Sequence, residues 1–186
     1  MKIVTANHFL ISSWSGGTTT QLIIFPEGAS LSERNFDWRI SSAVVETEES
    51  DFTVFDGYER ILIPLEGSLE MEHQTEKGIL NQSVNTFELA RFKGSWKTHG
   101  KGKLMDFNLI FKPVYAPVVS VQIWEAGKQV QWEPDVTAVY LHQGILESEG
   151  QRIDASAVLL PNGQSDSVCL TLERARVIII RMLRSE

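Results

Sequence analysis

Short apolar stretches with a two-residue alternation, each ended by a turn residue, are the feature of this sequence that most restricts its fold. A period of two is typical of strands that bury one face, and turns such as 56–57 and 161–163 recur at the spacing of sandwiches and barrels. No segment has a convincing helical period, and residues 3–13 stay unassigned. The sequence therefore predicts an all-β protein. The expected strands lie at 20–25, 38–45, 60–72, 104–111, 119–124, 137–141, 157–160, 168–172 and 176–183.

Composition and charge exclude several classes of protein. The 186 residues are 42% hydrophobic and 22% charged, which excludes a disordered tail. A net charge of −7 repels nucleic acid and anionic membranes. No apolar stretch approaches the roughly 20 residues that span a bilayer, and the N-terminus lacks the apolar core of a secretion signal. The single cysteine, Cys169, lies in an alternating apolar stretch and is expected to be buried. We therefore expect a cytoplasmic protein that binds neither nucleic acid nor membrane.

A weak internal repeat predicts two similar lobes. Residues 65–70 (LEGSLE) resemble residues 142–147 (HQGILE), and further matched features follow in the same order. All-β proteins contain similar hairpins without duplication, but the shared order favours duplication. Two prolines within 112–117 punctuate the join. We therefore place a first lobe, including the N-terminal segment, at 1–114 and a second, smaller lobe at 115–186.

The strands and glycine turns between residues 57 and 111 resemble a cupin, a small jelly-roll barrel. Cupins that bind metal carry a His-x-His pair and a glutamate before one glycine turn, and a further histidine after the next. In this chain Arg60 stands at the glutamate position, residues 53–56 cover the histidine pair, and Lys97 stands at the last histidine. The sequence therefore predicts a barrel in which cations replace the metal ligands.

A barrel interior that carries cations is suited to an anionic ligand. A guanidinium is donor-only and always protonated, so it cannot bind a metal ion, but its planar fork matches a carboxylate. The four histidines, His8, His73, His99 and His142, lie far apart in the sequence and form no ligand cluster. We therefore predict neither metal nor cofactor. His99 could reach the pocket, but a solvated loop histidine is the preferred interpretation.

Further segments supply candidate binding residues. Residues 14–22 (WSGGTTTQL) place two glycines before three threonines, which is typical of an anion cradle and equally of a polar turn that feeds a strand. In FDWRISSA, alternation puts Asp37 and Arg39 on one face, and their mutual neutralisation at the surface is the preferred interpretation. Asp106 and Asn108 also share one face of a strand, either inside a wet cavity or on the outer wall.

Four ordered motifs, WSGGTTTQL, FDWRISSA, FTVFDGYERIL and DFNL, resemble the HutD/Ves family over about residues 8–111, and the second lobe matches more loosely. The resemblance implies a two-lobed cupin fold, or bicupin, and a protein of histidine utilisation that binds a small metabolite. Trp14 stands where many members have asparagine, so the ligand can differ from theirs. The ligand-binding residues that the resemblance implies are Thr18, Thr19, Arg39, Arg60, Asp106 and Asn108.

Three functional hypotheses follow. The first is a metal-free regulator or buffer of histidine catabolism, in which Arg60 pairs the carboxylate of urocanate, histidine or a formyl or formimino derivative of glutamate. The second is a metal-free isomerase or amide hydrolase with Asp106 or His99 as general base. The third is an interaction protein, such as a homodimer, anchored by tryptophans, although core burial is the preferred interpretation of these side chains. The candidate anchors are Trp96, Trp124 and Trp132.

Overall fold

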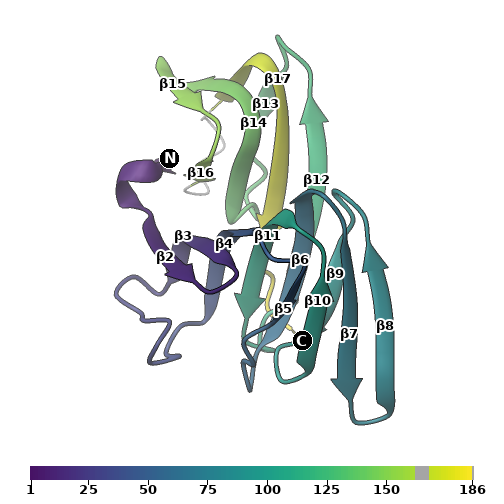
Figure 1. The fold of residues 1–186 in the computed structure, drawn as a ribbon. Helices are drawn as coiled ribbons and strands as arrows, with labels where there is room; N and C mark the ends of the chain where they lie inside the picture. The colour runs from purple at the N-terminus through teal and green to yellow at the C-terminus, as the bar shows by residue number, and fades with distance from the viewer. Residues whose placement is uncertain (162–167, 186) are drawn as a thin grey trace. The chain divides into compact units, whose positions relative to one another are not determined.

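The computed structural model describes residues 1–161 and 168–185, so most of the turn expected at 161–163 lies outside the described residues. The chain divides into two compact units (Figure 1). One unit, the first lobe, is Leu10–Pro113, and the other, the second lobe, combines Met1–Phe9 with Val114–Glu186. The described residues of both are built from strands, which confirms the all-β class. Within them, no helix has the length and apolar character that crossing a membrane requires.

The N-terminal segment belongs to the second lobe and not, as expected, to the first. Strand β1 (Lys2–Val4) pairs antiparallel with β16 (Ala157–Leu160), and Met1 packs against the apolar cluster of the second lobe. A short 3₁₀ helix, η1 (Ala6–His8), then leads into β2 (Leu10–Trp14). Pairing between strands as distant in the chain as β1 and β16 leaves no local pattern, so the sequence does not predict β1.

The first lobe contains two antiparallel sheets. A six-stranded sheet has the order β2-β3-β4-β11-β6-β9, and a four-stranded sheet has the order β5-β10-β7-β8. Residues of both sheets, such as Leu62, Met71 and Phe92, form one buried apolar cluster. The strands are β3 (Gly17–Phe25), β4 (Trp38–Val45), β5 (Glu49–Asp51), β6 (Glu59–Glu66), β7 (Leu69–Thr75), β8 (Gly78–Val84), β9 (Ala90–Lys93), β10 (Lys97–Lys101) and β11 (Leu104–Phe111).

The second lobe is built on a seven-stranded sheet with the central order β1-β16-β14-β17-β12, in which β13 also pairs with β17 and β15 with β14. The two strands expected at 168–172 and 176–183 form one long strand, β17, because pairing with β14 continues across the charged residues between them. The fully buried Cys169 fulfils its expected role. The strands not yet bounded are β12 (Val118–Trp124), β13 (Gln129–Gln131), β14 (Ala138–Ser148), β15 (Gln151–Asp154) and β17 (Val168–Arg181).

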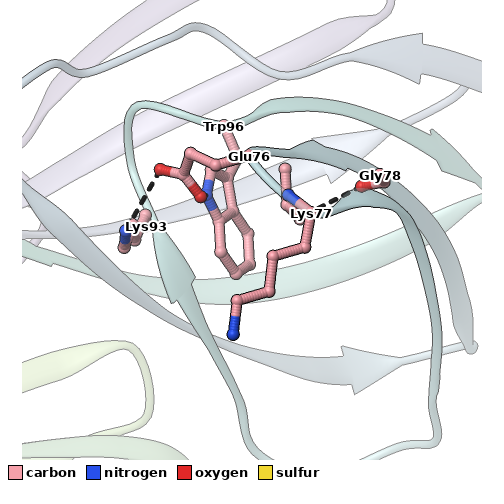
Figure 2. Close-up of polar contacts among 6 residues, drawn as sticks. Glu76, Lys77, Gly78, Lys93 and Trp96 are labelled. Atoms are coloured by element: carbon pink, nitrogen blue, oxygen red, sulfur yellow. Dashed lines mark hydrogen bonds and ion pairs between the residues drawn. The ribbon is translucent and has the colours of Figure 1, made fainter.

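None of the three candidate tryptophan anchors stands free at the surface. Trp124 and Trp132 are buried in the apolar cluster of the second lobe. Trp96 is half-buried in the first lobe, where its indole N–H donates to Glu76 Oε2 at 3.3 Å (Figure 2). Lys93 Nζ pairs with Glu76 Oε1 at 3.1 Å, so these three side chains connect the β7–β8 turn to the segment between β9 and β10. Core burial, the preferred interpretation, therefore holds for Trp124 and Trp132, and Trp96 packs partly buried against the apolar cluster of the first lobe.

Candidate functional site

One face of the six-stranded sheet in the first lobe lines a cavity of about 300 Å³. The sheet contributes polar side chains from five strands, and the segment around β5 contributes aromatic ones. Strand alternation explains this composition, because every second residue of a strand faces the same side. The lining residues are Ser12, Trp14, Thr19, Leu31, Arg39, Ser41, Ala43, Val45, Asp51, Phe52, Thr53, Phe55, Arg60, Asp106, Asn108 and Ile110.

Backbone pairing arranges the polar lining in successive rows along β11. In the first row, Ile110 is flanked by Arg39 on β4 and Arg60 on β6. Asn108 stands in the next row and Asp106 in the third. The sequence left open whether Asp106 and Asn108 line a cavity or the outer wall of the barrel. In the structure both residues line the cavity.

Arg39 is buried, which makes the expected surface pairing with Asp37 wrong. Its Nε donates to Gln21 Oε1 and its Nη1 to Ser41 Oγ, both at 2.8 Å. Asp37 precedes β4 and lies next to the end of β11, where its carboxylate pairs with Lys112 Nζ at 2.8 Å. The register between β4 and β11, which no local pattern reveals, decides this pairing.

Arg60 is a buried cation with few protein partners. Its side chain is 7% exposed and its guanidinium lies over the rings of Phe52, at 5.0 Å, and Phe92, at 5.3 Å. Among the residues that the structure describes, its one hydrogen bond runs from Nη1 to Thr53 O at 3.4 Å, and Nε has no partner. A guanidinium has five N–H donors, and a buried charge is costly unless it is paired. Arg60 therefore keeps donor capacity for a ligand.

The carboxyl group of Asp106 is poised to titrate near neutral pH. Burial, with only 4% of the residue exposed, raises its pKa to about 7 against the opposing effects of Arg60, the Ala43 backbone and Arg39. Burial also lowers the pKa of both guanidinium groups to about 10, helped for Arg39 by repulsion from Arg60, so both stay charged at neutral pH. The inner part of the cavity is therefore net positive.

Two acceptor oxygens in the site lack hydrogen bonds. Asp106 Oδ1 and Asn108 Oδ1 are buried and have no partner among the described residues. Buried acceptors in native proteins are nearly always paired with protein or water. The middle of the cavity is therefore rich in acceptors, whereas the end at Arg60 is rich in donors.

The threonine motif divides between the two faces of β3. Thr19 pairs with Ser12 and Ala43 and lines the cavity. Thr18 pairs with Val44 and occupies the opposite face, because adjacent strand residues point to opposite sides. The structure therefore brings together five of the six predicted site residues and leaves Thr18 apart.

The cation and the histidine predicted beside the second glycine turn, Lys97 and His99, also lie outside the cavity. Lys97 is exposed on β10. His99 is half-exposed, and its Nδ1 lies 2.8 Å from Asp51 Oδ1 and its Nε2 3.5 Å from Glu49 Oε2. The hydrogen bond with Asp51, with further help from Glu49, raises the pKa of His99. His99 is thus a solvated residue, which agrees with the preferred interpretation of the sequence, although it lies on a strand and not in a loop.

Sequence reasoning missed the aromatic partners of Arg60 and the outer end of the cavity. Phe92 leaves no local signal, since it meets Arg60 only through the pairing of β6 with β9. Ser12 and Trp14 alternate within β2, and this pattern could have placed both on one face.

The residues at the positions of the metal ligands in metal-binding cupins do not fit a metal ion. Arg60 is donor-only, and Lys97 is an exposed cation. Within the part of the chain that the structure describes, no group of three or more His, Cys, Asp or Glu side chains is arranged to hold a metal ion. That the protein works without metal or cofactor stays a prediction.

Comparison with known proteins assigns the chain. The model of the HutD family matches residues 6–179. The chain belongs to the HutD family. A protein of Pseudomonas putida, described as an uncharacterised 21.2 kDa protein in the hutC 3′ region, is 31% identical over 120 residues, which cover 61% of this chain and 59% of that protein. These matches confirm the resemblance seen in the sequence. The HutD family is linked to histidine utilisation.

Solved structures show the fold. A conserved protein of unknown function from Pseudomonas aeruginosa PAO1, PA5104, has a TM-score of 0.77 at 22% identity and covers 98% of each chain. HutD from Pseudomonas fluorescens SBW25 has a TM-score of 0.71 at 19% identity and covers 100% of this chain and 99% of its own. Hazelnut (Corylus avellana) vicilin has a TM-score of 0.73 at 9% identity, with 97% and 85% covered. The predicted two-lobed cupin fold is thereby confirmed.

Proposed function

We propose that this HutD family protein binds a small organic acid in the first-lobe cavity and acts in the cytoplasm as a metal-free regulator or buffer of histidine catabolism. The observation that carries the proposal is Arg60, a buried guanidinium with a single long hydrogen bond within the described residues. A bidentate carboxylate would use the spare donors and offset the buried charge. Arg39 adds positive charge in the same row but gives two of its donors to Gln21 and Ser41.

The acceptors in the middle of the cavity define the rest of the ligand. Asp106 and Asn108 each present an oxygen without a hydrogen bond, so a ligand with an N–H donor beside its carboxylate suits this site. The family points to urocanate, histidine and formyl or formimino derivatives of glutamate, all of which combine a carboxylate with nitrogen. The hydroxyl of Thr19 supplies a further polar contact at the same wall.

Calorimetry with each of these four acids tests the proposal. Arg60→Ala should weaken binding of the true ligand by about 2 to 5 kcal/mol, because it removes one partner of a buried charge pair. Arg60→Met, which keeps the apolar packing on Phe52 and Phe92, should weaken it similarly. Arg91→Ala is the matched control, since Arg91 lies on the neighbouring β9 and pairs with Glu59 at the surface. If Arg60→Met leaves the affinity for every acid unchanged, the proposal is overturned. It is also overturned if the wild-type protein binds none of the four acids.

A metal-free enzyme is the second candidate, and Asp106 is the observation that favours it. A buried carboxyl with a pKa of about 7 beside arginines is suited to move a proton at neutral pH. His99, the other candidate base, lies outside the cavity lining. Nuclear magnetic resonance of each acid incubated with the protein distinguishes the two functions. Product that forms with the wild type but not with Asp106→Asn supports the enzyme, and unchanged acid that still binds supports the regulator or buffer.

A further inference from the structure

Two phenylalanine rings meet at the Arg60 guanidinium. Phe92 stands directly opposite Arg60 in the pairing of β9 with β6, so the two side chains share one face of the sheet. Phe52 directly follows β5, and its backbone N–H donates to Thr98 O on β10 at 2.9 Å. The ring centroids are 6.2 Å apart, and the ring planes differ by 18°. The guanidinium carbon lies over both rings, so each ring presents its π face to the cation.

The guanidinium lies on these rings although a carboxyl group lines the same cavity. Arg60 Nε and Asp106 Oδ1 are both buried, and neither has a hydrogen-bond partner among the described residues. In the same part of the chain, no ion pair joins the two side chains. Opposite charges attract each other strongly in a buried site. Arg60 does lower the pKa of Asp106, but burial outweighs this attraction and leaves that pKa at about 7. The two groups therefore act on each other without pairing.

We propose that Phe52 and Phe92 are positioning residues, which hold the Arg60 guanidinium apart from Asp106 and so keep its donors open to the carboxylate of an incoming acid. A ring face attracts a cation through its quadrupole and offers no lone pair, whereas a carboxylate partner would take two N–H donors at once. Phe92 is outside the cavity lining, so it acts through Arg60 and not on the acid itself. This inference rests on the proposed function, which assigns the acid to Arg60.

The size of the effect follows from how much of the protein keeps the guanidinium in place. Without the attraction of one ring, Arg60 divides its time between the remaining ring and Asp106. The affinity for a carboxylate then falls by the fraction of molecules in which the donors are still open. The free energy of a cation–π contact, from an exposed to a desolvated site, corresponds to a factor of about 2 to 30. Loss of one contact should therefore weaken binding by about 2- to 30-fold.

Fluorination of one ring tests the attraction without changing the packing. Pentafluorophenylalanine in place of Phe92 keeps the shape of the ring and reverses the charge of its face. Calorimetry with urocanate, histidine, formylglutamate and formiminoglutamate should show about 2- to 30-fold weaker binding of the acid that the wild type binds. The same replacement at Phe111 is the matched control. Phe111 is also buried and lies 5.3 Å from a guanidinium, that of Arg91, but it is outside the cavity lining, so the affinity should not change.

Conventional substitutions give the same test at the other ring. Phe52→Leu removes the π face and should weaken binding by a similar factor. Phe52→Tyr keeps the π face, and the partly exposed position accepts the added hydroxyl, so this variant should bind as the wild type does.

Titration of Asp106 in the protein without added acid is a readout that packing alone does not move. Arg60 on β6 and Arg39 on β4 are the charged side chains that act on this carboxyl, and Asp51 is the other carboxyl that lines the cavity. Arg39 is held by hydrogen bonds to Gln21 and to a serine of its own strand, so it stays in place. A guanidinium released from Phe92 approaches Asp106 and should lower its pKa. Carbon-13 NMR, with the signal assigned by Asp106→Asn, measures this change.

The outcomes separate this inference from the proposed function. If both rings can be altered without weakening the binding of any acid, while Arg60→Met still weakens it, the role of the rings is overturned and the proposed function stands. Weaker binding with an unchanged pKa of Asp106 would also overturn the inference, and so would an equal loss of affinity in the Phe111 control. Affinities that Arg60→Met leaves unchanged would remove the proposed function and the inference with it.

Discussion

Replacing Asp106 by asparagine should stabilise the protein at alkaline pH. The carboxyl group is buried, and its pKa rises from an ordinary value of 3.8 to about 7 even though Arg60 and Arg39 attract its charged form. The folded protein therefore holds this proton more tightly than the unfolded chain does. Ionisation of Asp106 therefore destabilises the folded state, whereas an asparagine amide of the same shape does not ionise.

The size and sign of the effect follow from proton linkage. Between pH 3.8 and about 7 the folded state binds the proton and the unfolded state does not, so the free energy of unfolding falls as pH rises. The slope is about 1.4 kcal/mol per pH unit for one proton. Over the full interval the loss amounts to about 4 kcal/mol, and it is constant above the folded pKa. Asp106→Asn should match the wild type near pH 4 and exceed its stability by about 4 kcal/mol at pH 8.

Urea denaturation followed by circular dichroism at pH 4, 5, 6, 7 and 8 measures this difference. Subtracting the unfolding free energy of the wild type from that of the Asp106→Asn variant cancels the contributions of the other titrating groups, which the two proteins share. Glu70→Gln, which removes an exposed carboxylate on β7, is the control for the loss of a carboxylate outside the cavity. A curve for Asp106→Asn that runs parallel to that of the wild type would refute the argument that Asp106 is protonated in the folded cavity.

Two further predictions concern groups outside the cavity. Cys169 is fully buried and its pKa is raised to about 11, so the native protein should react slowly with DTNB and completely only after unfolding in guanidinium; rapid reaction of the native thiol would contradict its burial. The pKa of His99 is raised mainly by Asp51, so this contact stabilises the fold at low pH and its contribution is lost as pH rises through the raised pKa. Asp51→Asn should lower the pKa of His99 in a proton NMR titration, and an unchanged value would exclude the ion pair in solution.

Strand alternation explains why part of the cavity was predictable. Asp106 and Asn108 were grouped on one strand face because a period of two is a local property of the sequence, but alternation did not decide whether their face, or that of Arg39, lines the cavity. The cupin resemblance placed Arg60 at a ligand position of the barrel for a related reason, since a hairpin fixes the register of the residues that precede its glycine turn. The same rule separates Thr18 from Thr19, and their assignment to one site overlooked it.

Contacts between distant segments could not be predicted in the same way. The pairing of Asp37 with Lys112 depends on the register of β4 against β11, and the placement of Phe92 beside Arg60 depends on that of β9 against β6. The N-terminal strand β1 joins β16 near the other end of the chain. Each of these pairings is chosen by the free energy of the whole sheet, and no short window of residues encodes it.

From its sequence alone, this chain is an all-β protein of two lobes, with cations at positions where a cupin that binds metal carries its ligands. Those properties follow from local periodicity, from glycine turns and from the charge of single side chains. Tertiary structure alone decided that Arg60 is buried with most of its donors unused and that Asp106 titrates near neutral pH. Burial and the absence of a partner are properties of the folded surroundings, so they exist only once distant strands have packed together.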